Sequence, residues 1–226
     1  MRVHRLRVIA TCVSLAALCG CAGTASRTTS AAPTSTQHAA ADPARYVAGG
    51  FQPDPARGVV MAIMPVPMTG DMAARIDLGF DRCFADTPGF QLRYPSAQMR
   101  TRMNGDHKLV LLLNQISKLE TDSKPGTTAP GLDTFMATHE LAHLREVLMT
   151  TDILLVPSAF EFGDKNKTTT GHFTARIYDL RTGRLLFRDV FRQTMPSGHN
   201  AQIAAAMEMI LTANARIAAD LLPKSH

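Results

Sequence analysis

The fold is decided by residues 152–191, which read DILLVPSAFEFGDKNKTTTGHFTARIYDLRTGRLLFRDVF. Hydrophobic alternation in this stretch predicts three consecutive antiparallel strands, over 153–162, 172–180 and 185–191. A polar loop at 163–169 separates the first two strands. The turn Arg181-Thr182-Gly183 separates the last two, since glycine takes positive φ at little cost. Such a meander buries one face only when helices cover it.

The buried face of this meander is expected to carry apolar side chains. On the second and third strands these are Phe173, Ala175, Ile177, Leu185, Phe187 and Phe191. Asp189 falls on the same face and is the exception to the pattern.

Strands and helices alternate before the meander. The expected elements are a buried strand over 58–66, an amphipathic helix over 71–85, a strand over 90–94 and a helix over 96–103. Residues 108–120 fit either a buried strand or a helical stripe. We favour the strand, because this segment runs into a polar stretch as 153–162 does. Residues 121–133 are expected to form an exposed loop.

Two further helices flank the meander. The first, over 134–149, presents Leu141, Leu144 and Leu148 on its apolar side. The second begins after Asn200, its expected N-cap, and ends before Pro223. These elements predict an α/β (α+β) domain, with a mixed, largely antiparallel sheet of about four to five strands and helices packed on it.

The N-terminus has the order of a bacterial lipoprotein signal. Three arginines precede an apolar segment, 8–18, that is too short to span a membrane. Residues 18–21, LCGC, resemble a lipobox, in which Cys21 receives lipid, palmitate included, and becomes the mature N-terminus. An ordinary secretory signal is the alternative. By resemblance to lipoproteins, Ala22 after the cysteine implies anchoring in the outer membrane, on its periplasmic face.

Composition then sets the predicted domain boundaries. A signal peptide spans 1–20, a lipidated N-terminus and flexible linker spans 21–56, and one globular periplasmic domain spans 57–226. The linker is rich in Ala, Thr, Ser and Pro and has no apolar periodicity, so it is expected to act as a tether of about 30 Å reach.

The charge balance gives no reason to expect a nucleic-acid partner. The chain has 24 Lys and Arg against 19 Asp and Glu, a net charge of +5. Without the three arginines of the signal peptide, 21 face 19 and the net charge falls to +2. The basic balance therefore belongs partly to the signal, and no run of Lys and Arg remains.

One cysteine stays in the predicted domain. Cys12 and Cys19 leave with the signal and Cys21 takes lipid, so Cys83 has no intramolecular disulfide partner. Cys83 falls on the apolar stripe of helix 71–85, which favours a buried small apolar residue. A reactive thiol or an intermolecular bridge is the alternative.

Residues 139–143, HELAH, fit the H-E-x-x-H pattern on a helix expected independently. Two histidines four residues apart share a helix face, so His139 and His143 can bind one zinc ion. Glu140 would then act as general base toward a metal-bound water. The pattern therefore makes a zinc peptidase one hypothesis.

Three observations favour an ordinary surface helix instead. His139 and His143 lie more than about 90° from the centre of the apolar side. No third ligand is evident, since Glu161 falls on a strand and Glu208, on the last helix, is the only reasonable glutamate. A strand meander follows the motif, where zinc proteases have helices. The isolated His107, His172 and His199 are interpreted as surface or loop histidines.

The order of elements also carries a resemblance. VVMAIMPV at 59–66, TDILLVPS at 151–158 and TARIYDLRTGRLLF at 174–187 resemble periplasmic lipoproteins of the curli-secretion and penicillin-binding-protein-activator type, and the N-terminal domain of TolB. The resemblance covers 58–222, with an insertion at 105–131 that departs from the compact pattern. It implies an α/β sandwich used as a protein-binding module in the cell envelope.

Two functional hypotheses follow from the sequence. The first is a membrane-tethered lipoprotein that binds or assembles another envelope protein, with no catalysis and no cofactor. The second is a membrane-anchored zinc peptidase that uses His139, Glu140 and His143.

Overall fold

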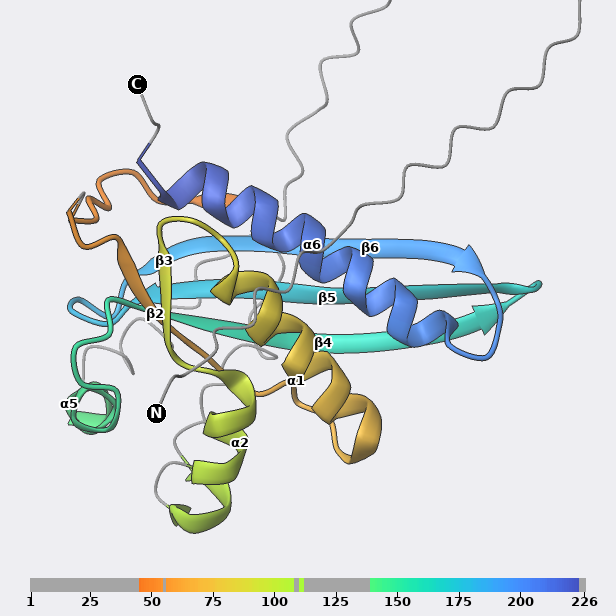
Figure 1. Cartoon of the computed structure of the whole chain (residues 1–226), viewed down its shortest axis with the longest axis horizontal. Helices are drawn as coiled ribbons and strands as arrows, with labels where there is room; N and C mark the ends of the chain where they lie inside the picture. Colours follow the sequence, from red (N-terminus) through yellow and green to blue (C-terminus); the bar gives the residue numbers. More distant parts are fainter. Residues whose placement is uncertain (1–44, 55, 108–109, 112–138, 224–226) are drawn as a thin grey trace, which may run out of the picture. The chain divides into compact units, whose positions relative to one another are not determined.

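The computed structural model describes residues 45–54, 56–107, 110–111 and 139–223. These residues form one mixed sheet of six strands in the order β1-β6-β5-β4-β2-β3 (Figure 1). The strands are β1 (Tyr46–Val47), β2 (Val59–Ile63), β3 (Phe90–Tyr94), β4 (Ile153–Lys165), β5 (Thr168–Asp179) and β6 (Leu185–Pro196). Strand β2 pairs in parallel with β3 and β4, and the other pairs are antiparallel. The predicted α+β class and mixed sheet are confirmed, with six strands in place of about four to five.

Four helices accompany the sheet in the described residues. They are α1 (Gly70–Ala85), α2 (Ser96–Gly105), α5 (His139–Val147) and α6 (Ala201–Leu221). Helix α1 is the crossover that two parallel neighbours such as β2 and β3 require. The predicted helices over 71–85 and 96–103 and the closing helix are confirmed, although the side chain of Asn200 makes no cap hydrogen bond.

The segment 108–120 is described only at Val110 and Leu111, and both are helical. The N–H of Val110 donates to the carbonyl of Asp106 at 3.1 Å. The strand interpretation is wrong for these two residues, because the helical hydrogen bond fixes their backbone. The remainder of 108–120, the expected loop 121–133 and residues 134–138 lie outside the described residues.

The meander is confirmed, but its strands are longer than predicted. The expected polar loop 163–169 is wrong, because β4 and β5 continue to a turn of two residues. Asn166 and Lys167 occupy this turn with φ of 51° and 63°, the backbone that suits a tight hairpin. These polar residues can belong to paired strands, because an antiparallel sheet can bury one face and expose the other to water.

A bulge in β4 sets which side chains face the core. The register shifts between Ser158 and Glu161, where Ala159 has a φ of 50°. The extra residue moves Phe160 onto the same face as Ile153. The ring of Phe160 then stacks on that of Phe173, with centroids 4.5 Å apart.

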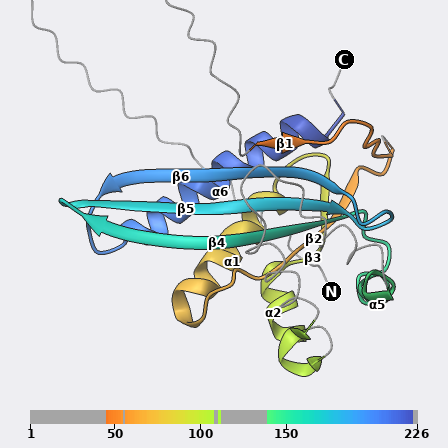
Figure 2. The same cartoon turned by 180° about the vertical axis from the view of Figure 1, so that it is seen from behind.

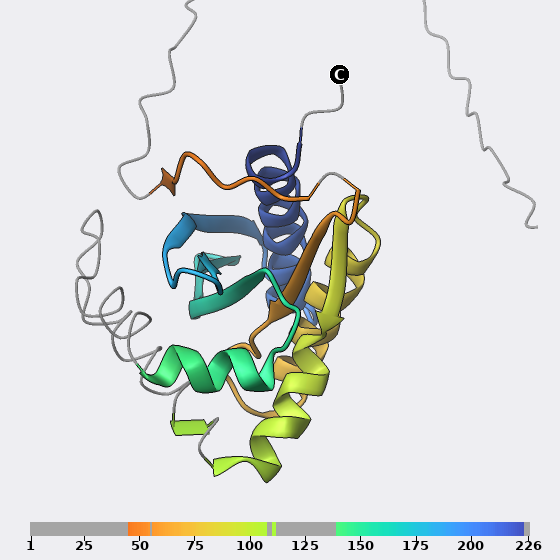
Figure 3. The same ribbon diagram turned by 90° about the vertical axis from the view of Figure 1, so that its left-hand side faces the viewer.

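The sheet has a separate core on each face. The first core lies under α1 and α6 and includes Phe80, Phe84, Ile153, Leu155, Phe173, Ile177, Phe187, Met209 and Ile217. The second core lies under α2 and α5 and includes Tyr94, Met99, Leu144, Leu148, Leu154, Val156, Tyr178 and Leu185. Successive strand residues point to opposite faces, so the two cores are separated by the sheet. Figure 3 shows α5 near α2 and away from α6.

Two neighbouring residues of the third strand, Leu185 and Leu186, lie on the opposite faces from those predicted. Leu185 belongs to the second core, because a shift near Tyr178 places Leu186 in the first core instead. Asp189 is on the first face as predicted and only 1% exposed. Arg216 of α6 reaches it, with Nη1 2.8 Å from Oδ2, so the buried carboxylate is paired.

The sheet begins earlier in the chain than the predicted domain start at 57. Tyr46 and Val47, placed in the linker by the sequence, form β1 and pair with the edge of β6 (Figure 2). Arg45 also binds Asp220 of α6 at 2.6 Å. This hydrogen bond raises the pKa of Arg45 further above its ordinary value. Residues 1–44, including the proposed lipid site Cys21, lie outside the described residues.

A buried polar network fixes α2 against α1. The Asp77 carboxylate accepts hydrogen bonds from Val66 N–H and Ser96 Oγ, and Arg100 Nε lies 2.6 Å from it. Asp81 accepts the N–H groups of Ser96 and Ala97, at the first turn of α2. Burial raises the pKa of Asp81, and these two N–H groups oppose the rise.

Candidate functional site

The H-E-x-x-H motif, residues 139–143, lies on helix α5, as the sequence predicted. The side chains of His139, Glu140, Leu141 and His143 lie outside the described set. Leu144 and Leu148 are buried in the second core, so the predicted packing side of this helix is confirmed at these two positions. The zinc hypothesis stays a prediction, because no described side chain tests it.

The two glutamates considered as a third zinc ligand lie apart from α5. Glu208 is exposed on α6, which covers the first core, whereas α5 covers the second. Glu161 is exposed on β4, with Oε2 3.5 Å from Nε2 of His172. Within the described residues, no three His, Cys, Asp or Glu side chains gather as a metal site would need.

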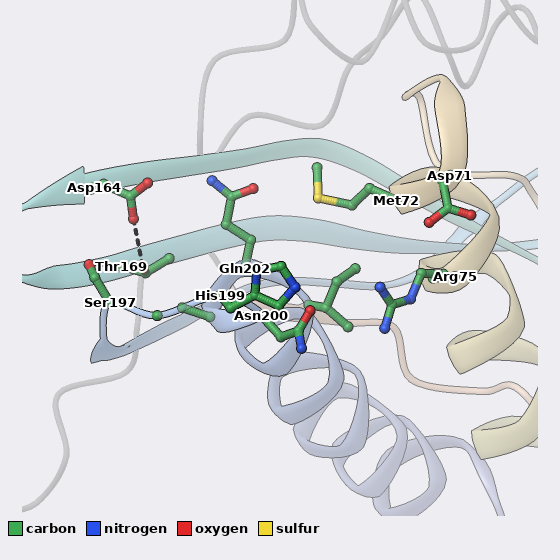
Figure 4. A pocket seen from close by; sticks show the side chains of 12 residues that line it. Asp71, Met72, Arg75, Asp164, Thr169, Ser197, His199, Asn200 and Gln202 are labelled. Atoms are coloured by element: carbon green, nitrogen blue, oxygen red, sulfur yellow. Dashed lines mark hydrogen bonds between the residues drawn. The ribbon is translucent and has the colours of Figure 1, made fainter.

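A polar cleft opens where α1 and α6 begin (Figure 4). Its volume is about 710 Å³. It is lined by Asp71, Met72 and Arg75 of α1, Asp164 and Thr169 of the β4–β5 hairpin, and residues 197–203. We call this the polar cleft. The β4–β5 hairpin and the start of α6, which line it, are at the far end of the strands from α5 (Figure 1).

Hydrogen bonds inside the polar cleft join the hairpin to the loop before α6. Thr169 Oγ1 donates to Asp164 Oδ1 and lies 3.1 Å from Ser197 Oγ. No hydrogen bond joins His199 to Ser197 among these lining residues. The cleft thus presents hydrogen-bond donors and acceptors, together with carboxylate and guanidinium groups. Its serine is hydrogen-bonded to a threonine, whereas a nucleophilic serine would be hydrogen-bonded to a base.

A second depression continues from the polar cleft between α1 and α6. Its volume is about 460 Å³. It is lined by Arg75, Leu78, Gly79, Arg82, Cys83 and Asp86 of α1 and by Ile203, Met207, Ile210 and Leu211 of α6. We call this the α1–α6 groove. Arg75 and Ile203 line both depressions, so the two adjoin, and we call the pair the trough.

Gly79 leaves room for the Met207 side chain at the floor of the groove. A Cβ atom at Gly79 would lie 2.6 Å from the end of the Met207 side chain and 3.5 Å from that of Ile210. Side chains of α6 therefore pack directly on the α1 backbone at this position.

Apolar side chains stand exposed on both walls of the groove. Leu78 on α1 is 44% exposed and Leu211 on α6 is 54% exposed. Facing apolar residues beside the half-buried Met207 and Ile203 make a contiguous apolar strip. Contiguous apolar surface, unlike scattered single residues, marks a place of contact with another molecule.

Cys83 lies at the edge of this groove and is half-buried rather than buried. Burial raises the pKa of its thiol, and a hydrogen bond from Asn214 opposes the rise. The Nδ2 of Asn214 lies 3.2 Å from Sγ. A raised pKa keeps the thiol protonated and less reactive, which supports the apolar interpretation of Cys83 over a reactive thiol.

The sequence interpretation missed this groove. The sequence pattern places Cys83 on the apolar stripe of helix 71–85 but does not single out Leu78 or Leu211. The sequence does carry a signal, because each leucine lies outside the buried stripe of its helix, on the opposite side. An apolar residue outside such a stripe indicates exposed apolar surface.

No described helix is long and apolar enough to cross a membrane. Neither a protein-family model nor a curated protein matches the sequence.

Several solved structures are similar to this chain. One is the hypothetical protein CT253 from Chlamydia trachomatis, with 10% identity, a TM-score of 0.45 and coverage of 73% of this chain and 98% of that one. Another is the lipoprotein GNA1162 from Neisseria meningitidis, with 14% identity, a TM-score of 0.39 and coverage of 71% and 98%.

A third is PelC from Paraburkholderia phytofirmans, a dodecamer, with 10% identity, a TM-score of 0.34 and coverage of 80% and 96%. These likenesses are too distant to carry a functional argument. They do not test the resemblance to curli-secretion proteins, penicillin-binding-protein activators or TolB, which stays a prediction.

Proposed function

We propose that this chain is a lipid-anchored module of the bacterial outer membrane that binds another envelope protein through the α1–α6 groove. It acts by binding and carries out no catalysis. The observation that carries this proposal is the pair of exposed leucines, Leu78 and Leu211, on opposite walls of one groove. Apolar side chains in this arrangement lose contact with water when a partner segment fills the groove.

The lipid anchor rests on the sequence of residues 18–21 and the linker that follows. A cysteine that carries several acyl chains holds a domain at the bilayer without a membrane-spanning helix. Changing Cys21 to Ser should release the protein from the membrane fraction, whereas Cys12→Ser should leave it bound. A Cys21→Ser variant that still pellets with outer membranes and labels with palmitate would contradict the anchor.

Photo-crosslinking in living cells tests the binding surface. An amber-encoded photo-crosslinker at Leu78 or Leu211 should give an adduct of one defined partner protein. The matched control places the same residue at Arg192, which is exposed on β6 outside the trough. Adducts that form equally well at Arg192, or at neither leucine, would overturn the proposed surface.

Metal analysis of the purified domain separates binding from the zinc-peptidase alternative. We expect far less than one zinc per chain, and no change in unfolding on adding a chelator. Replacing His139 and His143 with Gln should change stability by no more than about 0.5 kcal/mol. Stoichiometric zinc that disappears in this double variant, with activity lost in Glu140→Gln, would establish the alternative.

A further inference from the structure

The walls of the α1–α6 groove are two straight helix ridges. On α1 the lining residues recur every three or four positions from Arg75 to Asp86, and on α6 they recur likewise from Ile203 to Leu211. Residues at this spacing lie on one side of a helix. The groove between the ridges is about 16 Å long on the α1 side and about 12 Å long on the α6 side, since each helical residue rises about 1.5 Å.

We propose, resting on the function proposed above, that the partner segment in this groove is an amphipathic α-helix that lies along α1 and α6. A groove between two helices accepts the ridge of a third helix. A partner helix of about three turns matches the length of the α1 side of the groove. Its apolar side chains would enter the groove from positions i, i+3 or i+4, and i+7. Leu78, Met207 and Leu211 are the side chains those apolar side chains contact.

Charges along α1 define the flank of the partner helix. Arg75 and Arg82 are exposed, two turns apart, on either side of Leu78. Neither forms an ion pair with another described residue. A partner helix with two acidic residues spaced two turns apart beside its apolar stripe meets both guanidinium groups.

Mapping crosslinks from two points of the trough tests the conformation of the partner segment. Full-length chain in cells carries the photo-crosslinker at Gln202, in the cleft, or at Leu211, in the groove. Mass spectrometry then locates the attached residue in the captured partner. These points are about 13 Å apart along α6, which is about nine residues of a helical partner but only about four of an extended one.

The expected result has the Gln202 and Leu211 attachments about nine residues apart in the partner. A separation of about four residues would show an extended segment. Attachment to a second copy of this chain would place a homodimer in the groove. Each of these two outcomes overturns the inference while leaving the groove a binding surface, whereas absence of any groove-specific adduct contradicts the proposed function itself.

Charge reversal adds an independent arm. The double change Arg75→Glu with Arg82→Glu should lower the adduct yield at Gln202 by about tenfold, through lost attraction to acidic partner residues. The matched control, Arg93→Glu, alters an exposed arginine of β3 outside the trough and should leave the yield unchanged. Equal yields in the double variant and the control would contradict the proposed contact between acidic partner residues and the two arginines.

Discussion

The two faces of the sheet are covered to different extents. On the first face, apolar side chains continue along β4 and β5 as far as Phe160 and Phe173, under the length of α1 and α6. On the second face, Leu154 and Val156 are buried at the start of β4, but Glu161 and His172 further along reach solvent. The first core therefore holds the domain together, and the second fastens α2 and α5 at one end of it.

This comparison also explains the outer surface of α1 and α6. Their inner sides are filled by the first core, so Leu78 and Leu211 contribute nothing to it and stand exposed. Apolar side chains that the core does not use leave surface for a partner. The same two helices thus stabilise the fold through one side and present the groove on the other.

The largest loss of stability is expected from the aromatic centre of the first core. Phe173 contacts the rings of Phe80, Phe160 and Phe191. Phe173→Ala should lower the free energy of unfolding by about 3–5 kcal/mol, from lost burial and a cavity. Urea unfolding measures the change. A cost below about 1 kcal/mol, like that of a surface site, would refute the central role of this core.

The second core should respond more weakly to the same kind of change. Leu144→Ala on α5 should cost about 2–4 kcal/mol, since the side chain is fully buried against Met99 and Leu154. Unfolding followed by circular dichroism gives the value beside that of Phe173→Ala. If Leu144→Ala cost more than Phe173→Ala, the ranking of the two cores would be reversed.

Two deletions in the N-terminal segment locate the boundary between tether and domain. Deleting residues 24–43 should leave the melting temperature nearly unchanged, because the sequence there has no apolar periodicity. Deleting 24–50 removes β1 and the Arg45–Asp220 pair and should cost on the order of 2 kcal/mol. Equal melting temperatures for the two deletions would show that β1 adds nothing to the sheet.

The smallest expected effect is a dependence on pH at the contact between α1 and α2. Burial raises the pKa of Asp81, so protonation favours the folded state. Its contribution to stability is present below the ordinary aspartate pKa and is lost as pH rises through the raised value. Relative to the native chain, Asp81→Asn should therefore gain stability between about pH 4 and pH 7. A relative loss over that range would contradict the direction of the shift.

Much of the first face could be predicted from alternation, but the second core and the hairpin could not. The apolar run Ile153–Val156 is buried on both faces, which alternation alone does not reveal. The bulge at Ala159 and the turn at Asn166 and Lys167 depend on pairing with β5, so a polar stretch was interpreted as a loop. Non-local pairing of this kind leaves little trace in a single segment.

The candidate site was harder to predict than the fold. The sequence drew attention to His139 and His143 because a short motif is visible in one segment. The groove instead is lined by both Leu78 and Leu211. These residues lie far apart in the sequence and line one groove only because α1 and α6 pack side by side. Half of it could be anticipated, since each leucine lies off the buried stripe of its own helix.

The most direct test of the groove is the photo-adduct yield at Gln202 after Leu78 and Leu211 are both changed to Lys in the full-length chain. Both side chains are exposed and outside the core, so the melting temperature should stay close to that of the native chain. We expect the yield to fall on the order of tenfold, because two lysines remove the apolar strip that a partner contacts. An unchanged yield in a normally folded variant would contradict the account.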